Sequence, residues 1–305
     1  MEKAKGKKLF YRPAGKRKGM YTPTQIICVS FVIVIALGTF LLSLPVASKH
    51  GRLDVLDAMF TATSATCVTG LIVRDTWTQF TYFGQAVILL LIQVGGLGLV
   101  TLTSFFALAM RRRMGFRDLR LLGESVSADG YAQAKDVLKI VVGLAACFEG
   151  AGILLLLLAF VPQFGLQGIW ISIFTAISAF CNAGFDLFGR FGAYSSLVPY
   201  VNNYYVQAVI MFMIMAGGLG FMVWVELAEY RKKRRLSLHA KVVLQFSVIF
   251  WVGGAVLLAL LEWSNPRTMG GLSVPGKIMA ALFQSVSTRT AGMNTICLLY
   301  TSDAA

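Results

Sequence analysis

Charged residues are scarce in this sequence, and acidic residues are scarcer than basic ones. Only 14% of the 305 residues are charged, whereas a typical soluble domain contains about 25%. Hydrophobic residues make up 57% of the chain, and the mean hydropathy is +0.71. Several apolar runs reach 20 residues or more, which is long enough to cross a bilayer. The composition therefore excludes an ordinary soluble domain and predicts an all-α integral membrane protein in a lipid bilayer.

Histidine is nearly absent, and cysteines are not spaced as metal or redox motifs require. The sequence has two histidines and five cysteines, and no two cysteines have the Cys-x-x-Cys spacing. Cysteine is common as a small apolar residue in buried helices, which suffices to explain these five. We therefore expect no transition-metal site and no enzymatic activity.

The basic residues are clustered beside the apolar runs. Of 28 Lys and Arg residues, eight lie in 1–24, seven in 111–139 and six in 231–241. None of these segments forms a nucleic-acid-reading motif, so no nucleic-acid partner is expected. Lys and Arg beside membrane spans mark the cytoplasmic side. The pattern predicts a multi-pass protein of the cell membrane with a cytoplasmic N-terminus and a first span that is retained rather than cleaved as a signal peptide.

Five apolar segments are long enough to span a bilayer, and three others are too short. The predicted spans are residues 25–44, 83–110, 137–161, 206–225 and 242–261, and the predicted short helices are 55–66, 169–179 and 277–286. A 12-residue helix covers roughly 18 Å, about half of the hydrocarbon thickness. If the short helices crossed the membrane, the basic cluster at 111–139 would lie outside. If they enter and return on one side, all three clusters lie inside. The sequence therefore predicts repeated units of span, re-entrant pore loop and span.

These units divide the chain into segments. They are a basic cytoplasmic tail (1–24), a first repeat (25–110), a cytoplasmic linker with an amphipathic segment (111–136), a second repeat (137–230), a basic cytoplasmic loop (231–241) and a partial third repeat (242–296). The sequence Gly-Gly-Leu-Gly occurs at 95–98 and again at 217–220. It indicates close helix packing through small residues, a bendable wall beside a pore, or both.

Each short helix leads into a loop that contains a glycine, and we call residues 66–71, 180–185 and 289–294 the first, second and third glycine loops. Irregular backbone at membrane depth is tolerated only when it is buried or lines water, and its carbonyl oxygens can replace the hydration shell of a cation. The loops contain no carboxylate, which favours a monovalent cation over Ca²⁺ or Mg²⁺. The alternative is a buried loop with no ion. The candidate cation-binding residues are Thr66, Cys67, Val68, Thr69, Gly70, Cys181, Asn182, Ala183, Gly184, Thr290, Ala291 and Gly292.

Seven polar residues near these loops have two interpretations each. Glu149 lies within a predicted span, where an acid costs roughly 2.5–3.5 kcal/mol on insertion scales, and we favour a hydrogen bond to a neighbouring helix for it and for Gln93. The acids Asp54, Asp57, Asp75 and Asp186 either concentrate cations at the outer mouth or cap helices. Arg289 either pairs with an acid or forms a barrier to cations.

The three loops, in order and with matched spans, resemble the Trk/Ktr/HKT superfamily of potassium transporters, and most closely its KtrB-type membrane subunits. The resembling stretches are Thr66-Cys67-Val68-Thr69-Gly70-Leu71, Phe180-Cys181-Asn182-Ala183-Gly184-Phe185 and Arg289-Thr290-Ala291-Gly292-Met293-Asn294. Phenylalanine is usual in the family where this chain has Met293. The segment 261–266, before the third short helix, is also similar.

The resemblance implies four span–pore–span repeats around one K⁺ path, a membrane homodimer and a cytosolic nucleotide-binding ring as regulatory partner. Gly70 favours potassium, because sodium-permeable plant relatives have serine there, and Na⁺ coupling or permeation is the alternative. The sequence contains two full repeats and part of a third, without the family's gating loop and fourth repeat. We therefore expect a truncated chain in which residues 297–305 are a non-native tail, and a non-conducting assembly or regulatory fragment is the alternative function.

Overall fold

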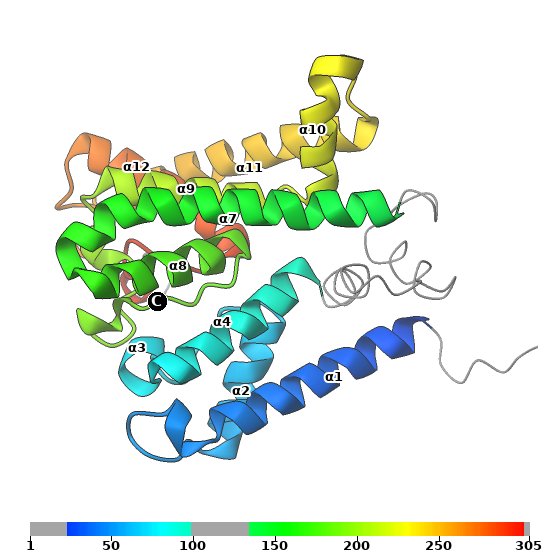
Figure 1. The fold of residues 1–305 in the computed structure, drawn as a ribbon. Helices are drawn as coiled ribbons and strands as arrows, with labels where there is room; N and C mark the ends of the chain where they lie inside the picture. Colours follow the sequence, from blue (N-terminus) through cyan, green and yellow to red (C-terminus); the bar gives the residue numbers. More distant parts are fainter. Residues whose placement is uncertain (1–22, 99–133, 302–305) are drawn as a thin grey trace, which may run out of the picture.

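A computed structural model describes residues 23–98 and 134–301 (Figure 1). The α-helices are α1 (Pro23–Leu42), α2 (Val55–Thr66), α3 (Thr76–Gln79), α4 (Tyr82–Leu97), α7 (Ala134–Phe164), α8 (Leu166–Phe180), α9 (Tyr204–Gly218), α10 (Phe221–Lys233), α11 (Leu238–Glu262) and α12 (Val274–Thr290). Short 3₁₀ turns lie at Pro45–Ala47, Phe188–Arg190, Val198–Tyr200 and Leu298–Tyr300. Within these ranges the only β-structure is an isolated bridge between Ser48 and Phe80, so the expectation of an all-helical chain is confirmed.

Two of the described helices are long and apolar enough to cross a membrane. They are α7, counted over Ile140–Phe164, and α11, and each provides 25 such residues. Helices α9 and α10 meet the same criterion only together, and they are bent by 97° relative to each other. The apolar parts of α1 and α4 that are described, Ile27–Leu42 and Tyr82–Leu97, are shorter. Large apolar side chains on the long helices face outward, such as Leu158 (71% exposed) and Leu260 (74% exposed), which suits helices surrounded by lipid.

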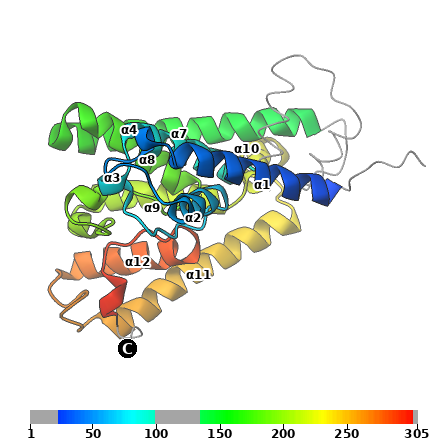
Figure 2. The same cartoon turned by 90° about the horizontal axis from the view of Figure 1, so that it is seen from below.

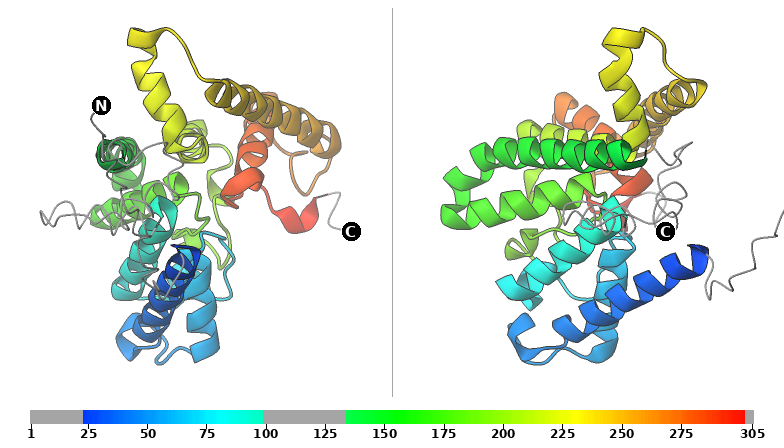
Figure 3. Two further views of the ribbon diagram at one scale, coloured as in Figure 1. Left: turned by 90° about the vertical axis from the view of Figure 1, so that its right-hand side faces the viewer. Right: turned by 45° about the vertical axis from the view of Figure 1, so that its right-hand side comes forward.

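The helices form three similar units. The first contains α1, α2 and α4, the second α7, α8 and α9, and the third α11 and α12, which lie side by side (Figure 2). Viewed along the long helices, the first unit (blue and cyan) lies at the bottom, the second (green) at the left and the third (gold to red) at the right (Figure 3). Within the described residues, the helices of each unit contact one another in the order of the chain.

A glycine at the same place in the first helix of each unit allows this packing. A side chain on Gly38 would lie 2.7 Å from Leu91 and 3.2 Å from Ala62, and one on Gly152 would lie 2.6 Å from Met213. Gly254 in α11 likewise faces Ser285 in α12. Because any larger residue would push the helices apart, these small residues permit the close approach that membrane helices use.

Two predicted spans are interrupted at the last glycine of Gly-Gly-Leu-Gly. Helix α4 ends at Leu97 before Gly98, and α9 ends at Gly218 before Gly220, so neither of the predicted spans 83–110 and 206–225 is one continuous helix. Residues 99–110 of the first of them lie outside the described residues. Gly98 and Gly220 have φ values of 78° and 83°, a region that other residues rarely adopt. Hydropathy shows no sign of such a break, because the residues on both sides of it are apolar.

Helix α7 also differs from its predicted bounds, because it continues past Pro162 to Phe164. Proline removes one backbone donor and clashes with the preceding turn, but here the helix ends two residues later, so little of it is disturbed. The short helix predicted at residues 55–66 agrees with α2, whereas α8 and α12 extend further than the predicted 169–179 and 277–286. Residues 1–22 of the predicted tail and 111–133 of the predicted linker lie outside the described residues.

Candidate functional site

The three glycine loops meet, although more than 100 residues separate each from the next. A Cβ atom placed on Gly70 would lie 2.9 Å from the carbonyl oxygen of Ala183 and 3.3 Å from the Cα atom of Gly184. A Cβ atom on Gly184 would overlap the carbonyl oxygen of Ala291 and lie 3.1 Å from the Cα atom of Gly70. The backbones of the first and second loops, and of the second and third, are therefore in direct contact.

Each loop glycine has a left-handed backbone conformation. The φ angles are 73° at Gly70, 74° at Gly184 and 76° at Gly292, where glycine avoids the cost that a Cβ atom brings. Two residues earlier, Val68 and Asn182 also have positive φ, 57° in both cases. A positive φ is a genuine outlier for a β-branched residue such as valine, and such strain tends to occur at functional sites. In the first and second loops, two residues with positive φ are thus separated by one other residue. This shared backbone conformation indicates that the carbonyl groups of both loops are held in defined directions.

A serine near the C-terminal end of each short helix holds the loop that follows. The contacts are Ser64 Oγ with Thr69 Oγ1 at 2.9 Å, Ser178 Oγ donating to the Phe185 carbonyl at 2.5 Å, and Ser287 Oγ donating to the Met293 carbonyl. These serines are not among the predicted site residues. The sequence signal was a serine five or six residues before each loop glycine. The bonds keep the loops folded back against the helices α2, α8 and α12.

Most side-chain oxygens of the predicted site are used within the protein. Thr66 Oγ1 donates to Ala62 within α2 at 2.7 Å, and Thr69 contacts Ser64. Thr290 Oγ1 donates to Asn182 Oδ1 at 2.8 Å and so joins the third loop to the second. The groups left to face an ion are therefore mainly backbone carbonyls. Helices α2 and α8 direct the partially negative ends of their dipoles toward these loops, which favours a cation.

The third loop differs in register from the other two. Helices α2 and α8 end four residues before their loop glycines, at Thr66 and Phe180, whereas α12 ends at Thr290, two residues before Gly292. Thr290 therefore lies in the last helical turn, and Ala291, with φ −95° and ψ −32°, caps it. The structure brings the predicted residues of all three glycine loops together. Thr290, however, is helical, and it contacts the second loop through its side chain.

The Gly-Gly pairs of α4 and α9 pack directly against the loops. Gly95 faces the carbonyl of Thr66, and a Cβ atom on Gly96 would lie 2.5 Å from Cys181 Sγ. Gly217 in α9 faces the carbonyl of Phe180, which is the position equivalent to Thr66. The close-packing interpretation therefore applies, because these glycines touch the loops, and each helix also ends at or directly after its Gly-Gly pair.

A polar contact behind the second loop joins two units. Gln93 in α4 donates through Nε2 to Glu149 Oε1 in α7 at 2.8 Å. The Cys181 thiol of the second loop lies 4.0 Å from Gln93 Oε1. The hydrogen bond expected for Glu149 and the one expected for Gln93 are thus one and the same bond.

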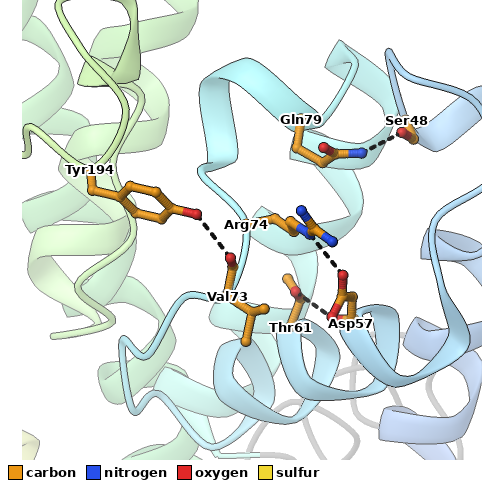
Figure 4. Close-up of polar contacts among 7 residues, drawn as sticks. All are labelled: Ser48, Asp57, Thr61, Val73, Arg74, Gln79 and Tyr194. Carbon is orange, nitrogen blue, oxygen red and sulfur yellow. Dashed lines mark hydrogen bonds and ion pairs between the residues drawn. The ribbon is translucent and has the colours of Figure 1, made fainter.

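On the side that was predicted to face outward, Asp75 connects the first unit to the second. Its Oδ1 accepts from Thr78 N at 2.8 Å, which caps α3, and its Oδ2 accepts from Tyr194 N at 3.1 Å. Tyr194 also donates through its hydroxyl to the Val73 carbonyl at 2.9 Å (Figure 4). Because Asp75 is only 5% exposed, it acts as a structural acceptor and not as a free charge at the mouth.

The other outer acids have separate roles. Asp57 forms an ion pair with Arg74 at 2.7 Å (Figure 4), and Asp54 precedes α2 without a side-chain capping bond. Asp186, two residues beyond Gly184, is partly buried, and this burial raises its pKa from 3.8 to about 6 despite a hydrogen bond from Phe188 N.

Arg289 stacks over Phe250 and Trp251 of α11, with its guanidinium carbon 5.6 Å and 6.0 Å from the ring centres. In the described ranges no group of three or more His, Cys, Asp or Glu could hold a metal ion.

Comparison with known proteins finds a matching family and named relatives. A family model described as TrkH, cation transport protein, matches residues 3–303. The chain is 37% identical over 277 residues to Ktr system potassium uptake protein B of Bacillus subtilis strain 168, covering 90% of this chain and 61% of that protein. It is 38% identical over 294 residues to the Ktr system potassium uptake protein B of Vibrio alginolyticus, covering 95% and 63%.

Two further similarities bear on the ion and the fold. Potassium/sodium uptake protein NtpJ of Enterococcus hirae is 35% identical over 285 residues, covering 93% of this chain and 62% of that protein. The crystal structure of the potassium transporter TrkH from Vibrio parahaemolyticus superposes with a TM-score of 0.61 at 16% identity, covering 92% of this chain and 53% of that one. This last match supports the fold alone. The chain spans about three fifths of the length of the curated relatives that it matches.

Proposed function

The chain belongs to the TrkH family of cation transport proteins, and from this premise we propose that it forms three walls of a potassium-uptake pathway in the cell membrane. It is a multi-pass membrane protein, and we propose that its N-terminus is cytoplasmic. In this proposal the three glycine loops together act as the selective part of the pathway.

The observation that carries the proposal is the contact between loops from three separate units. The backbones of three units meet at Gly70, Gly184 and Ala291, and the glycine of each loop has a positive φ. Their carbonyls are the groups best placed to replace water around a cation. No Asp or Glu occurs among the loop residues. A site of neutral oxygens suits K⁺, whereas Ca²⁺ and Mg²⁺ prefer carboxylates. Such a site supports ion conduction and gives no support for catalysis.

Sodium is the second candidate ion. One relative is named as a potassium/sodium uptake protein, so permeation by both ions, or sodium coupling, is the alternative to potassium alone. Glycine at position 70 favours potassium in this proposal. The proposed partners are a second copy of the chain and a cytosolic nucleotide-binding ring that would contact the basic cytoplasmic segments.

Growth and ion flux test the proposal together. The protein at its natural full length, expressed in a bacterium that lacks potassium uptake, should restore growth at low external potassium. The purified protein in liposomes should then carry Rb⁺ or K⁺ faster than Na⁺. We expect Gly70→Ser to lower the K⁺-over-Na⁺ flux ratio by about tenfold or more, which corresponds to roughly 1.4 kcal/mol.

Gly51→Ser provides the matched control. Gly51 has a φ of 88° with nothing within 4 Å of a built Cβ atom, so it carries similar backbone strain away from the loops. An unchanged ratio in Gly70→Ser would remove the selectivity assignment, and absence of any cation flux in the natural full-length protein would remove the proposed function.

A further inference from the structure

The polar pair Glu149–Gln93 lies where the first and second units meet, directly behind the glycine loops. Gln93 belongs to α4, and Gly95 and Gly96 follow it within the same turn. Gly95 faces the carbonyl of Thr66 at the start of the first loop, and Gly96 touches Cys181 of the second. Helix α4 therefore acts as a spacer between two loops, and its position determines how far apart they lie.

Only one of the two equivalent unit boundaries has this polar pair. Gly38, Gly152 and Gly254 are equivalent in the three units, and the residues three positions before them are Ile35, Glu149 and Trp251. In the same way, Met215 in α9 is equivalent to Gln93 in α4. The boundary between the second and third units thus has Met215 and Trp251, which are both apolar, where the first boundary has Gln93 and Glu149. Packing alone therefore does not require polar residues at this place.

The contacts of the pair lead to the second loop. Glu149 Oε1 accepts from Gln93 Nε2 at 2.8 Å, and Gln93 Oε1 faces the Cys181 thiol at 4.0 Å. Cys181 is 8% exposed, lies in the second loop and is the C-cap residue directly after α8. A hydrogen bond at membrane depth has no water to replace it, so the amide of Gln93 is held in one orientation, and α4 with it.

We propose that Glu149 is a positioning residue for selectivity, which holds α4 through Gln93 and thereby sets the spacing between the first and second glycine loops. The proposal rests on the proposed function, because it assumes that these loops select the ion. Glu149 does not touch the ion. It acts as the acceptor that fixes the spacer helix.

Three variants of the natural full-length protein separate hydrogen bonding from charge and from packing. Glu149→Gln keeps an acceptor for Gln93, and its K⁺-over-Na⁺ flux ratio should stay within about twofold of the original. Glu149→Ile, which introduces the residue found at the equivalent place in the first unit, should lower the ratio by about tenfold, the effect of losing one hydrogen bond to a partly buried polar partner. Leu158→Ala, at an exposed position of the same helix, is the control and should change nothing.

The double variant Glu149→Ile with Gln93→Met distinguishes positioning from stability. It makes this boundary apolar, like the boundary between the second and third units, so thermal stability in detergent should return to near the original value. The flux ratio should nevertheless stay low, because the orienting hydrogen bond is absent. A double variant that regains the original ratio would overturn the proposal, as would Glu149→Gln behaving like Glu149→Ile.

A second measurement does not depend on transport. The rate at which a small thiol reagent modifies Cys181, followed by mass spectrometry of its peptide, should rise by about tenfold in Glu149→Ile and remain unchanged in Glu149→Gln. An unchanged rate in Glu149→Ile would refute the positioning role even if the natural protein carried no cation. Conversely, if Cys181 reacts faster in Glu149→Ile but the natural protein carries no cation, the positioning role of Glu149 holds and the proposed function fails.

Discussion

Replacement of Gly184 by alanine should be the most damaging single-methyl change in the glycine loops. Gly184 lies in the second loop with φ 74°, and adopting this conformation with a Cβ atom costs roughly 1–2 kcal/mol. The new methyl group would also overlap the carbonyl oxygen of Ala291 in the third loop. The carbonyl oxygen belongs to the backbone, and the position of a Cβ atom is fixed by its own backbone, so no side-chain rotation can relieve the overlap.

The geometry sets the minimum displacement. Real Cβ contacts are not found below 3.0 Å, and the built Cβ atom of Gly184 lies well inside that limit. The Ala291 carbonyl or the whole second loop must therefore move by at least about half an ångström, a distance over which a van der Waals contact loses a quarter to a half of its energy. A carbonyl moved by this amount no longer presents the same distance to a bound ion.

Two glycines supply the scale against which Gly184→Ala is measured. Gly70→Ala introduces a similar φ strain but places its Cβ atom 2.9 Å from Ala183 O, so only a small adjustment is needed. Gly51→Ala introduces the strain with nothing within 4 Å. We expect the K⁺-over-Na⁺ flux ratio in liposomes to fall by about a hundredfold in Gly184→Ala and by about tenfold in Gly70→Ala, and to stay unchanged in Gly51→Ala. Each tenfold step corresponds to roughly 1.4 kcal/mol. Equal losses in Gly184→Ala and Gly70→Ala would show that strain, and not contact between the loops, determines the effect, and would refute the reasoning.

Two further predictions concern the outer side. Asp75→Ala should lower the free energy of unfolding by about 2–3 kcal/mol, because it leaves the donors of Thr78 and Tyr194 without their acceptor. Thermal unfolding in detergent measures this change. The control is Asp54→Ala, which removes no capping bond and should change the free energy of unfolding by less than about 0.5 kcal/mol. For Asp186, the folded-state pKa of about 6 exceeds 3.8, so the native state binds the proton more tightly and stability falls as pH rises from about 4 to about 6. Asp186→Asn should therefore melt higher than the natural protein at pH 8 and equally at pH 3.5, and a difference that does not depend on pH would contradict this.

The sequence was sufficient for the architecture because its strongest signals are local. Segment length and hydropathy separate spans from short helices, and the distribution of Lys and Arg predicts which segments return on one side. The bounds predicted for α2 agree with the structure, because a polar segment ends before Val55 and the apolar helical pattern stops at Thr66. These features need no knowledge of what each helix packs against.

The breaks and pairings depended on distant parts of the chain and could not be read in this way. The helix ends at Gly98 and Gly220 lie inside apolar runs, so length alone predicted longer helices. Gln93 and Glu149 were each expected to bond to a neighbouring helix, but 56 residues separate them, and nothing in the sequence says that they bond to each other. The serines that hold the loops were missed because serine is common in membrane helices. The partners of Ser178 and Ser287 are backbone carbonyls, which leave no mark on composition.

The three loops are similar in sequence but unequally restrained, and this inequality identifies the second loop as the structural centre of the site. Gly96 of α4 and Gly217 of α9 confine it on two sides, and Thr290 reaches it from the third loop. Gly292, by contrast, has nothing among the described residues within 4 Å of a built Cβ atom. A change at the second loop must therefore be transmitted to both neighbouring loops, whereas a side chain at Gly292 meets no neighbour among the described residues. We accordingly expect selectivity to be most sensitive to substitutions that contact the second loop, wherever in the chain they occur.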